Sequence, residues 1–390
     1  MKPIQVLHSI GSFLEISENW IYPQVTAVSG VIGAVVTRRA TNQDVFPLAA
    51  DRLVLYRSPW ERTFRGRRLL EPLERRVVAR RIASHVALRS WNPDILHAHI
   101  GTQGWLSLDL QQKLEVPLVT SFYGADAWLL PERVRCWRDR YRRLFAEGDL
   151  FLVEGPAMRA RLTDLGCPEG KIVIQRIGAA VDTLPWIRKT FWDGLNIVMV
   201  GRFVEKKGLI DGLRACALAR AQGAELHVTI VGDAKDGDAT GERLKAEMQA
   251  CAAESALAGR VHFMGFIPLD QIHGVVAAHN LFLCPSKHAS DGDAEGGSPV
   301  ILTEAMAAGL LCVGTRHCDI PELILDGTTG WLCAEGDVDH MARILVNASQ
   351  QLEEGIRLTE AGRRHVEDHF SVDRQMDQLR GVYDSVLSIA

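Results

Sequence analysis

The sequence predicts an α/β protein made of two domains, each with a parallel β-sheet covered by helices on both faces. Its 390 residues exceed one ordinary domain and suffice for two sizeable cores. Short apolar segments alternate with segments of helical spacing in both halves, which is typical of doubly wound sheets. Residues 1–190 hold 27 Lys and Arg against 19 Asp and Glu, whereas residues 191–390 hold 17 against 29. We therefore expect an N-terminal domain at 1–186, a second domain at 187–370, and a C-terminal helix at 371–390 that could return to the first domain.

In the first half, six apolar segments have the length of buried strands. The first lies at the N-terminus, where the apolar run is too short for a signal peptide, so we interpret it as a strand. Helical spacing at 101–116 separates the third strand from the fourth. The expected strands lie at 3–10, 33–39, 94–100, 117–124, 149–155 and 171–178.

The second half repeats this alternation. Its expected strands lie at 195–203, 225–233, 260–267, 279–286, 309–315 and 329–333. Helical segments separate them at 208–223, 241–259, 269–279 and 298–309, and a mostly helical tail runs from 337 to 390. Ligands of such sheets bind beyond the carboxyl ends of the strands, so the residues that follow each strand are the candidates for a site.

Composition and missing motifs exclude several classes. The eight cysteines form no C-x-x-C pair, which predicts free thiols and a reducing, cytoplasmic location. No apolar run is long enough to span a membrane. Neither a Walker P-loop nor a G-x-G-x-x-G fingerprint follows a strand, which argues against a nicotinamide cofactor.

A basic loop follows the first strand of the second half. It contains Gly201, Arg202 and Lys207 ahead of a helix. Arginine offers a planar fork of donors and lysine a compact charge, and the pair suits a diphosphate. A solvated basic loop is the alternative.

An acidic, glycine-rich loop opens the helix near residue 300. Gly296 and Gly297 allow a ligand to approach the backbone, and Ser298 before Pro299 is typical of an N-cap and first helical position. Carboxylates accept hydrogen bonds from sugar hydroxyls, so Glu295 and Glu304 favour a nucleotide sugar as the ligand. An acidic surface loop before a core helix is the alternative.

These segments carry a family resemblance. Glu295, the glycines and Glu304, followed by "AMAAG", resemble the E-x7-E signature of glycosyltransferase family 4, whose members are retaining enzymes with two Rossmann-like domains facing a cleft (the GT-B fold). The segments "VGRFVEKKGL", "VGD", "RVHFMGF", "LCPS" and "DGTTGWL" resemble other landmarks of that family in its order. "DILHAHIGTQGWLSL" and "VTSFYGADAWLLP" resemble the exopolysaccharide-type subgroup. The similarity covers nearly the whole chain.

The resemblance implies a set of donor contacts. Arg202 and Lys207 would hold the diphosphate. Glu295 would hold the donor sugar and phosphate together with the backbone of Gly296, Gly297 and Ser298. Glu304 would hold the ribose. The base would lie beside Phe266 and Ile267, with Gly201 and Gly232 nearby, and Gly11 would approach the phosphate from the other domain. Arg202, Lys207, Glu295 and Asp126 are the expected catalytic residues.

The sequence departs from the family at two places. Eight residues rather than seven separate Glu295 from Glu304. Tyr123 stands where the family commonly has a histidine that contacts the donor sugar, and a phenol does not titrate near neutral pH.

Acceptor contacts are expected from the N-terminal domain. His99 and Tyr123 would line the cleft, whereas His97 would have a structural role. Asp126 could deprotonate an acceptor hydroxyl or cap a helix. Asp291-Gly292-Asp293 imitates a D-x-D metal motif, but we interpret it as a solvated loop and expect no metal, because Arg202 and Lys207 supply the positive charge.

Two arginine-rich stretches, at 52–89 and 133–143, are interleaved with Trp60, Phe64, Trp137 and Tyr141. They favour peripheral contact with an anionic membrane surface, and the alternative is helix faces paired with their own glutamates. No nucleic-acid-binding signature accompanies them.

The sequence therefore predicts a cytoplasmic, metal-independent hexosyltransferase, and the family resemblance implies that it retains the anomeric configuration. It would use a UDP- or GDP-sugar as donor substrate and need no cofactor. The acceptor would be a sugar or a lipid-linked glycan in polysaccharide assembly. Alternatives are a sugar-nucleotide 2-epimerase of the same fold, a small-molecule glycosyltransferase, and a binding protein without turnover.

Overall fold

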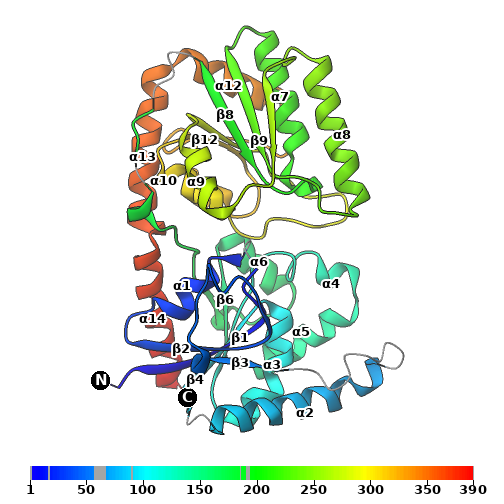
Figure 1. Ribbon diagram of the computed structural model, residues 1–390, viewed down its shortest axis with the longest axis vertical. Coiled ribbons are helices and arrows are strands. Elements are labelled where there is room, and N and C mark those ends of the chain that lie inside the picture. The colour runs from blue at the N-terminus through cyan, green and yellow to red at the C-terminus, as the bar shows by residue number, and fades with distance from the viewer. Residues whose placement is uncertain are drawn as a thin grey trace. The chain divides into compact units, whose positions relative to one another are not determined.

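The computed structural model divides into two compact α/β units (Figure 1). Unit 1 comprises Met1–Ile177 and Asp373–Ala390, and unit 2 comprises Gly178–Val372. The structure describes residues 2–15, 18–56, 67–88, 91–184, 186–189 and 194–389. Each unit contains one sheet whose described strand pairs are all parallel, as the sequence predicts.

The sheet of unit 1 has the strand order β3-β2-β1-β4-β5-β6-β7. The chain proceeds outward from β1 to β3 and then returns to add β4 on the other side of β1, so the order reverses between β1 and β4. The strands are β1 (Ile4–Phe13), β2 (Val31–Ala40), β3 (Leu53–Leu55), β4 (Ile95–His99), β5 (Leu118–Ser121), β6 (Leu150–Val153) and β7 (Ile172–Ile174).

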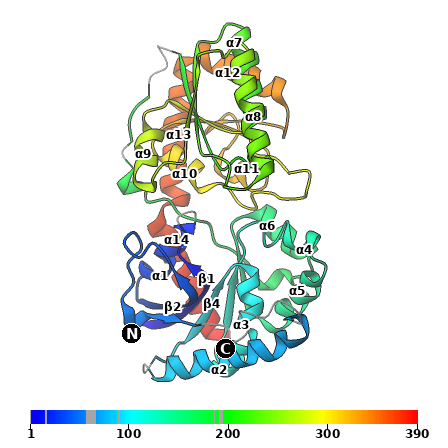
Figure 2. The ribbon, with the colours of Figure 1, turned by 45° about the vertical axis from the view of Figure 1, so that its right-hand side comes forward.

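Helices cover both faces of this sheet (Figure 2). On one face, a core cluster joins the strands to α2 (Arg67–Leu88), α3 (Gly101–Leu114), α5 (Cys136–Glu147) and α6 (Pro156–Asp164). The other face carries α1 (Ile21–Thr26) and the last helix, α14 (Val372–Ile389), whose Tyr383 hydroxyl lies 2.8 Å from Nδ1 of His97. The short α4 (Leu130–Arg133) precedes α5.

The sheet of unit 2 has the order β10-β9-β8-β11-β12-β13. The reversal lies between β8 and β11, and crevices at such a reversal are where open parallel sheets bind ligands. The strands are β8 (Leu195–Val200), β9 (Leu226–Val231), β10 (Val261–Gly265), β11 (Leu281–Cys284), β12 (Leu311–Thr315) and β13 (Trp331–Cys333).

Two separate cores flank this second sheet. One contains side chains of α7 (Leu209–Ala221), α8 (Ala239–Glu254), α12 (Val338–Gln350) and α13 (Leu352–Phe370). The other contains side chains of α9 (Leu269–Ala277), α10 (Val300–Ala307), α11 (Ile320–Leu323) and, again, α13. The sheet is thus covered on both faces, which accounts for its mostly apolar strands.

All eight cysteines lie in the described residues and are free thiols, as their spacing predicts. Among the helices that the structure describes, none is long and apolar enough to cross a membrane.

Candidate functional site

Two loops at the carboxyl edge of the second sheet flank the reversal between β8 and β11. The first, after β8, contains Gly201, Arg202 and Lys207, and the second runs from 285 to 299 after β11. The Lys287 N–H donates to the Lys206 carbonyl at 2.9 Å, so the two loops are joined through their backbones. The basic and the acidic candidates of the sequence are therefore neighbours in space.

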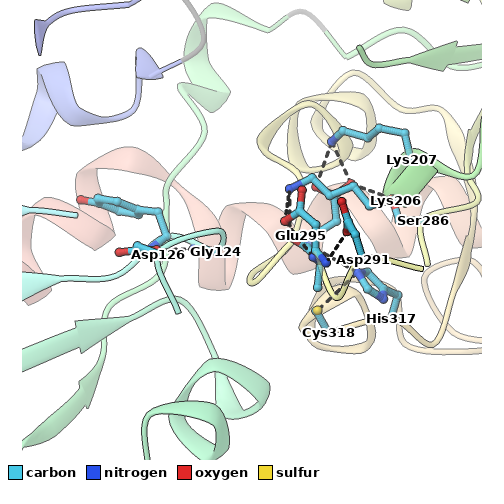
Figure 3. Close-up of polar contacts among 12 residues, drawn as sticks. Gly124, Asp126, Lys206, Lys207, Ser286, Asp291, Glu295, His317 and Cys318 are labelled. Carbon is cyan, nitrogen blue, oxygen red and sulfur yellow. Dashed lines mark hydrogen bonds and ion pairs between the residues drawn. The ribbon is translucent and has the colours of Figure 1, made fainter. Parts of the chain in front are cut away.

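Lys206 holds the acidic loop in place. Its side chain is buried, and its ammonium lies 3.1 Å from Oδ1 of Asp293 and 2.9 Å from the carbonyl of Ala294 (Figure 3). The second carboxylate of the D-x-D segment is therefore paired with a lysine of the neighbouring basic loop.

Lys207 and Glu295 form a largely buried ion pair. The Lys207 ammonium lies 2.8 and 3.0 Å from the two carboxylate oxygens, and the Ser286 hydroxyl donates to Oε1 at 2.8 Å (Figure 3). Burial raises the pKa of the Glu295 carboxyl, but the charges of Lys207 and Lys206 outweigh burial, so its pKa lies below the ordinary value. Glu295 is thus ionised at neutral pH, as a carboxylate that accepts sugar hydroxyls must be.

A histidine and a second glutamate fix the backbone at Glu295. The Glu295 N–H donates to Nε2 of His317 at 3.1 Å, and Nδ1 of the same ring lies 2.7 Å from Oε1 of Glu335. Because a carboxylate accepts hydrogen bonds, Nδ1 carries the ring proton and Nε2 is the acceptor. Burial lowers the pKa of His317, which agrees with this neutral tautomer.

Arg202 differs from its two lysine neighbours. Its side chain is exposed, and within the described residues it makes no hydrogen bond or ion pair. A cation of this kind, on the same loop as Lys207, is available to an incoming anion.

Gly201 and Gly232 bring two strand ends into close contact. Gly232 has φ +128°, and a Cβ there would lie 2.0 Å from the Gly201 carbonyl oxygen. Both the backbone angle and the space at this position therefore require glycine.

We expect Gly232→Ala to destabilise unit 2 by about 2–4 kcal/mol and to weaken nucleotide binding, because strain adds to the clash with Gly201. Gly223→Ala is the matched control, since Gly223 has φ +97° but nothing within 4 Å of the added Cβ. Thermal unfolding of both variants measures the difference. Equal destabilisation would show that the close approach to Gly201 contributes nothing.

The helix that follows the acidic loop begins later than predicted. α10 starts at Val300, Pro299 occupies the N-cap position, and the Ser298 hydroxyl donates to the Asp319 carbonyl at 2.9 Å. The prediction of Ser298 as N-cap is therefore wrong, because its side chain binds the segment before α11 instead. Gly296 has φ +88°, so glycine is required there.

The remaining donor candidates lie around this edge of the sheet. On α10, Oε1 of Glu304 lies 3.3 Å from Nε2 of His273 on α9, and the carboxylate raises the pKa of that imidazole. Phe266 directly follows β10 and is exposed, and Ile267 packs on the core beside α9 and α10. Gly297 is buried in the acidic loop.

The acceptor candidates lie at the carboxyl edge of the first sheet, in unit 1. The Tyr123 hydroxyl lies 2.8 Å from Nδ1 of His99, and burial raises the pKa of this phenol. His99 is fully buried and Nε2 of its ring lies 3.0 Å from Nδ1 of His8. His99 is therefore buried and contacts the Tyr123 hydroxyl, whereas the sequence predicts that His99 itself lines the cleft. Gly11 lies on β1, where a Cβ would meet the Gln103 side chain at 2.9 Å.

Asp126 has three partners in the backbone. Its carboxylate accepts the N–H groups of Gly101 at 2.8 Å, Gly124 at 3.0 Å and Tyr123 at 3.2 Å. Gly101 is the first residue of α3, so this geometry favours the helix-capping alternative over a general base.

The buried histidines of unit 1 predict acid sensitivity. His97 lies between the hydroxyls of Tyr383 and Ser121, and burial lowers its pKa to about 3. The unfolded chain therefore binds more protons than the folded chain below the ordinary value of 6.5.

We expect stability to be full above pH 6.5 and to fall as the pH drops toward 3, by about 1 kcal/mol per pH unit for His97 alone. His97→Gln should reduce this slope by that amount in denaturant titrations at several pH values. His85→Gln, at an exposed position of α2, is the control. Identical slopes for wild type and His97→Gln would contradict the expectation.

The first arginine-rich stretch lies partly outside the described residues, which leave out Arg57, Arg62 and Arg65 with Trp60 and Phe64. Arg75 is buried, pairs with Asp109 at 2.6 Å, and lies over the Trp105 ring at 4.2 Å. In the second stretch, the described ion pairs are Arg138–Glu132, Arg142–Asp139 and Arg143–Glu147. These described pairs agree with the alternative of helix faces matched to their own acids.

Sequence reasoning missed four residues of the site in unit 2: Lys206 as a loop anchor, Ser286, His317 and Glu335. Ser286, His317 and Glu335 each follow a strand by one or two residues. Their positions after strand ends are the signal by which the sequence marks them as candidates.

Comparison with known proteins identifies the family of the chain. The family model of glycosyl transferases group 1 matches residues 194–351, and that of the glycosyl transferase 4-like domain matches residues 25–178. The amylovoran biosynthesis glycosyltransferase AmsK of Erwinia amylovora is 36% identical over 75% of this chain and 70% of its own length. The putative colanic acid biosynthesis glycosyltransferase WcaL of Escherichia coli is 30% identical over 78% of this chain and 74% of its own.

Solved structures share the fold at low sequence identity. HepE of Anabaena, in complex with UDP and glucose, has a TM-score of 0.76 at 16% identity and covers 98% of this chain and 100% of its own. A glycosyltransferase of Rickettsia africae has a TM-score of 0.80, also at 16% identity, over the whole of both chains. Two parallel-sheet units of this topology, with these matches, define a GT-B glycosyltransferase. The chain belongs to glycosyltransferase family 4, the family that its sequence resembles.

Proposed function

We propose that the protein transfers a hexose from a nucleoside-diphosphate sugar to an acceptor hydroxyl, with retention at the transferred carbon and without a metal. The observation that carries the proposal is the Lys207–Glu295 pair with the exposed Arg202 at the strand reversal of unit 2. Cations that suit a diphosphate and an ionised carboxylate that suits sugar hydroxyls thus share one edge of the sheet.

Each charged group has a role in this reaction. Arg202 and Lys207 stabilise the negative charge that grows on the leaving diphosphate, which is the largest contribution expected of such a site. Glu295 accepts hydrogen bonds from the hexose and favours the positive charge that develops on its ring. Glu304 binds the ribose, and Phe266 and Ile267 flank the base.

Retention does not require an enzyme nucleophile here. Glu295 is held by Lys207 and Ser286, and Asp126 by three backbone N–H groups, so neither carboxylate is poised to attack the sugar. We therefore propose departure of the diphosphate and attack by the acceptor on the same face of the sugar. Asp126 acts in this scheme by holding the loop that carries Tyr123.

The acceptor is proposed to be a glycan, lipid-linked or free, of the kind assembled in exopolysaccharides. AmsK and WcaL, which are named for amylovoran and colanic acid biosynthesis, support this class. Within unit 1, a pocket of about 420 Å³ contains Trp105, Trp137, Arg75 and Arg140 among its lining residues. Indole faces beside guanidinium groups suit a sugar with an anionic group. A cytoplasmic protein at an anionic membrane surface would meet such acceptors.

Incubation with labelled UDP- and GDP-sugars tests the activity. Transfer to an acceptor, or slow release of free sugar, supports the proposal, and the anomeric configuration of the product tests retention. An isomerised donor would instead identify a 2-epimerase, and a donor bound without change a binding protein. Activity that persists in excess EDTA supports metal independence.

A further inference from the structure

Three strand ends of unit 2 bring together two histidines, a cysteine and a glutamate. His288 follows β11, His317 and Cys318 follow β12, and Glu335 follows β13. One donor atom from each of His288, His317 and Cys318 lies within 4.8 Å of the other two. Imidazole and thiolate are the ligands that zinc and other soft divalent ions prefer.

Glu335 orients both imidazoles. Its Oε1 lies 2.7 Å from Nδ1 of His317 and 2.9 Å from Nδ1 of His288, and its Oε2 accepts the His288 N–H at 2.8 Å. Both Nδ1 atoms therefore carry the proton, and both Nε2 atoms keep a lone pair. A carboxylate behind the distal nitrogen is the usual support of a histidine that binds metal.

Cys318 is held in an unusual backbone conformation. Its φ of 45° lies in the left-handed region that favours glycine, and its Sγ lies 3.3 Å from Nε2 of His317. Two such ligands of one tetrahedral zinc ion would be separated by roughly 3.5 Å.

We propose that His288, His317 and Cys318, supported by Glu335, form a binding site for a soft divalent transition-metal ion such as Zn²⁺. The ion binds the two Nε2 atoms and the thiolate, releases one proton from Cys318, and keeps a fourth position for water. Nothing in the transfer reaction uses this ion.

The site has a consequence for the donor loop, which rests on the proposed function. His317 Nε2 accepts the Glu295 N–H at 3.1 Å, and the Gly296 N–H faces the Cys318 sulfur. A metal on Nε2 and Sγ takes both acceptors away from these N–H groups. Metal binding therefore loosens the loop that holds the donor, and it inhibits transfer.

A second histidine group within the described residues, formed by His8, His97 and His99, is less suited to bind a metal ion. Both nitrogens of His97 already bond to hydroxyls, of Tyr383 and Ser121, and all three rings are fully buried.

Cobalt titration of the full-length protein tests the site without any substrate. We expect one equivalent of Co²⁺ to produce a thiolate charge-transfer band in the near ultraviolet. Cys318→Ser should abolish the band, and His288→Gln should weaken cobalt binding at least tenfold. Cys136→Ser, at a partly buried cysteine of α5 in unit 1, is the matched control and should leave the band unchanged. A missing band in the wild type, or a band that survives in Cys318→Ser, would overturn the proposal.

The coupling is tested by calorimetric titration of UDP with and without Zn²⁺. We expect zinc to weaken UDP binding at least tenfold in the wild type and to have little effect on UDP binding by His288→Gln, whose exposed side chain makes none of the donor contacts proposed above. Cobalt binding with unchanged UDP affinity would overturn the coupling alone. Cobalt binding in a protein that binds no nucleotide would instead contradict the proposed function.

Discussion

Replacing both Arg202 and Lys207 by alanine is expected to weaken UDP and GDP binding by roughly 100-fold or more. Each hydrogen bond between a charged side chain and a phosphate contributes about 1.5–3 kcal/mol, and two are lost. The rate of transfer should fall at least as far, because the same cations stabilise the leaving diphosphate. Calorimetric titration with each nucleotide measures the affinity.

The single variants separate the two cations. Lys207→Ala also leaves the buried Glu295 carboxylate without its main partner, so it should lower the unfolding temperature, whereas Arg202→Ala should not. Arg343→Ala, at an exposed arginine of α12, is the matched control and should bind nucleotide as the wild type does. Nucleotide affinity that is equal in the double variant and in Arg343→Ala would contradict the diphosphate site.

Glu295→Gln is expected to reduce kcat for transfer by roughly 100-fold while UDP affinity changes by less than about threefold. Glutamine keeps the shape and the hydrogen bond to Ser286, but it removes the negative charge beside the donor sugar. The negative charge of Glu295 matters most in the transition state, where positive charge develops on the hexose. UDP contains no hexose, so its binding should depend little on this charge. Steady-state kinetics with the donor sugar, together with UDP titration, give the two numbers.

A loss of kcat without a matching loss of UDP affinity distinguishes a catalytic carboxylate from a structural one. Glu247→Gln, which loses an exposed ion pair with Arg214 between α8 and α7, is the control for the loss of an acid. If Glu295→Gln lost UDP affinity and kcat in the same proportion, Glu295 would act by holding Lys207 and not by contacting the sugar.

Much of the fold could be predicted from the sequence because parallel strands in both units are buried on both faces. Segments such as 195–200 and 226–231 are mostly apolar, and loops or helices with clear breaks separate them. β3 escaped prediction, because three residues at a sheet edge carry too little pattern. The strand-end rule selected Arg202 and Lys207, and the family resemblance selected Gly232; the structure places these three residues at one edge of the sheet.

The contacts within the site could not be predicted in the same way. Ser298 has the composition of an N-cap, but the carbonyl of Asp319, 21 residues later, takes its hydroxyl. Lys206 and Lys207 are adjacent and alike in sequence, yet one is buried against Asp293 and the other faces Glu295. Such differences depend on the contacts between the loops after β8, β11 and β12. The local sequence pattern of each loop does not predict these contacts.

The central claim is that a nucleoside diphosphate binds at the strand reversal of unit 2. A crystal structure of the protein with UDP tests it most directly. We predict that the β-phosphate lies within hydrogen-bonding distance of the Arg202 guanidinium and the Lys207 ammonium, with the uracil beside Phe266 and Ile267. A UDP molecule bound elsewhere, with Arg202 and Lys207 free of phosphate, would contradict the account.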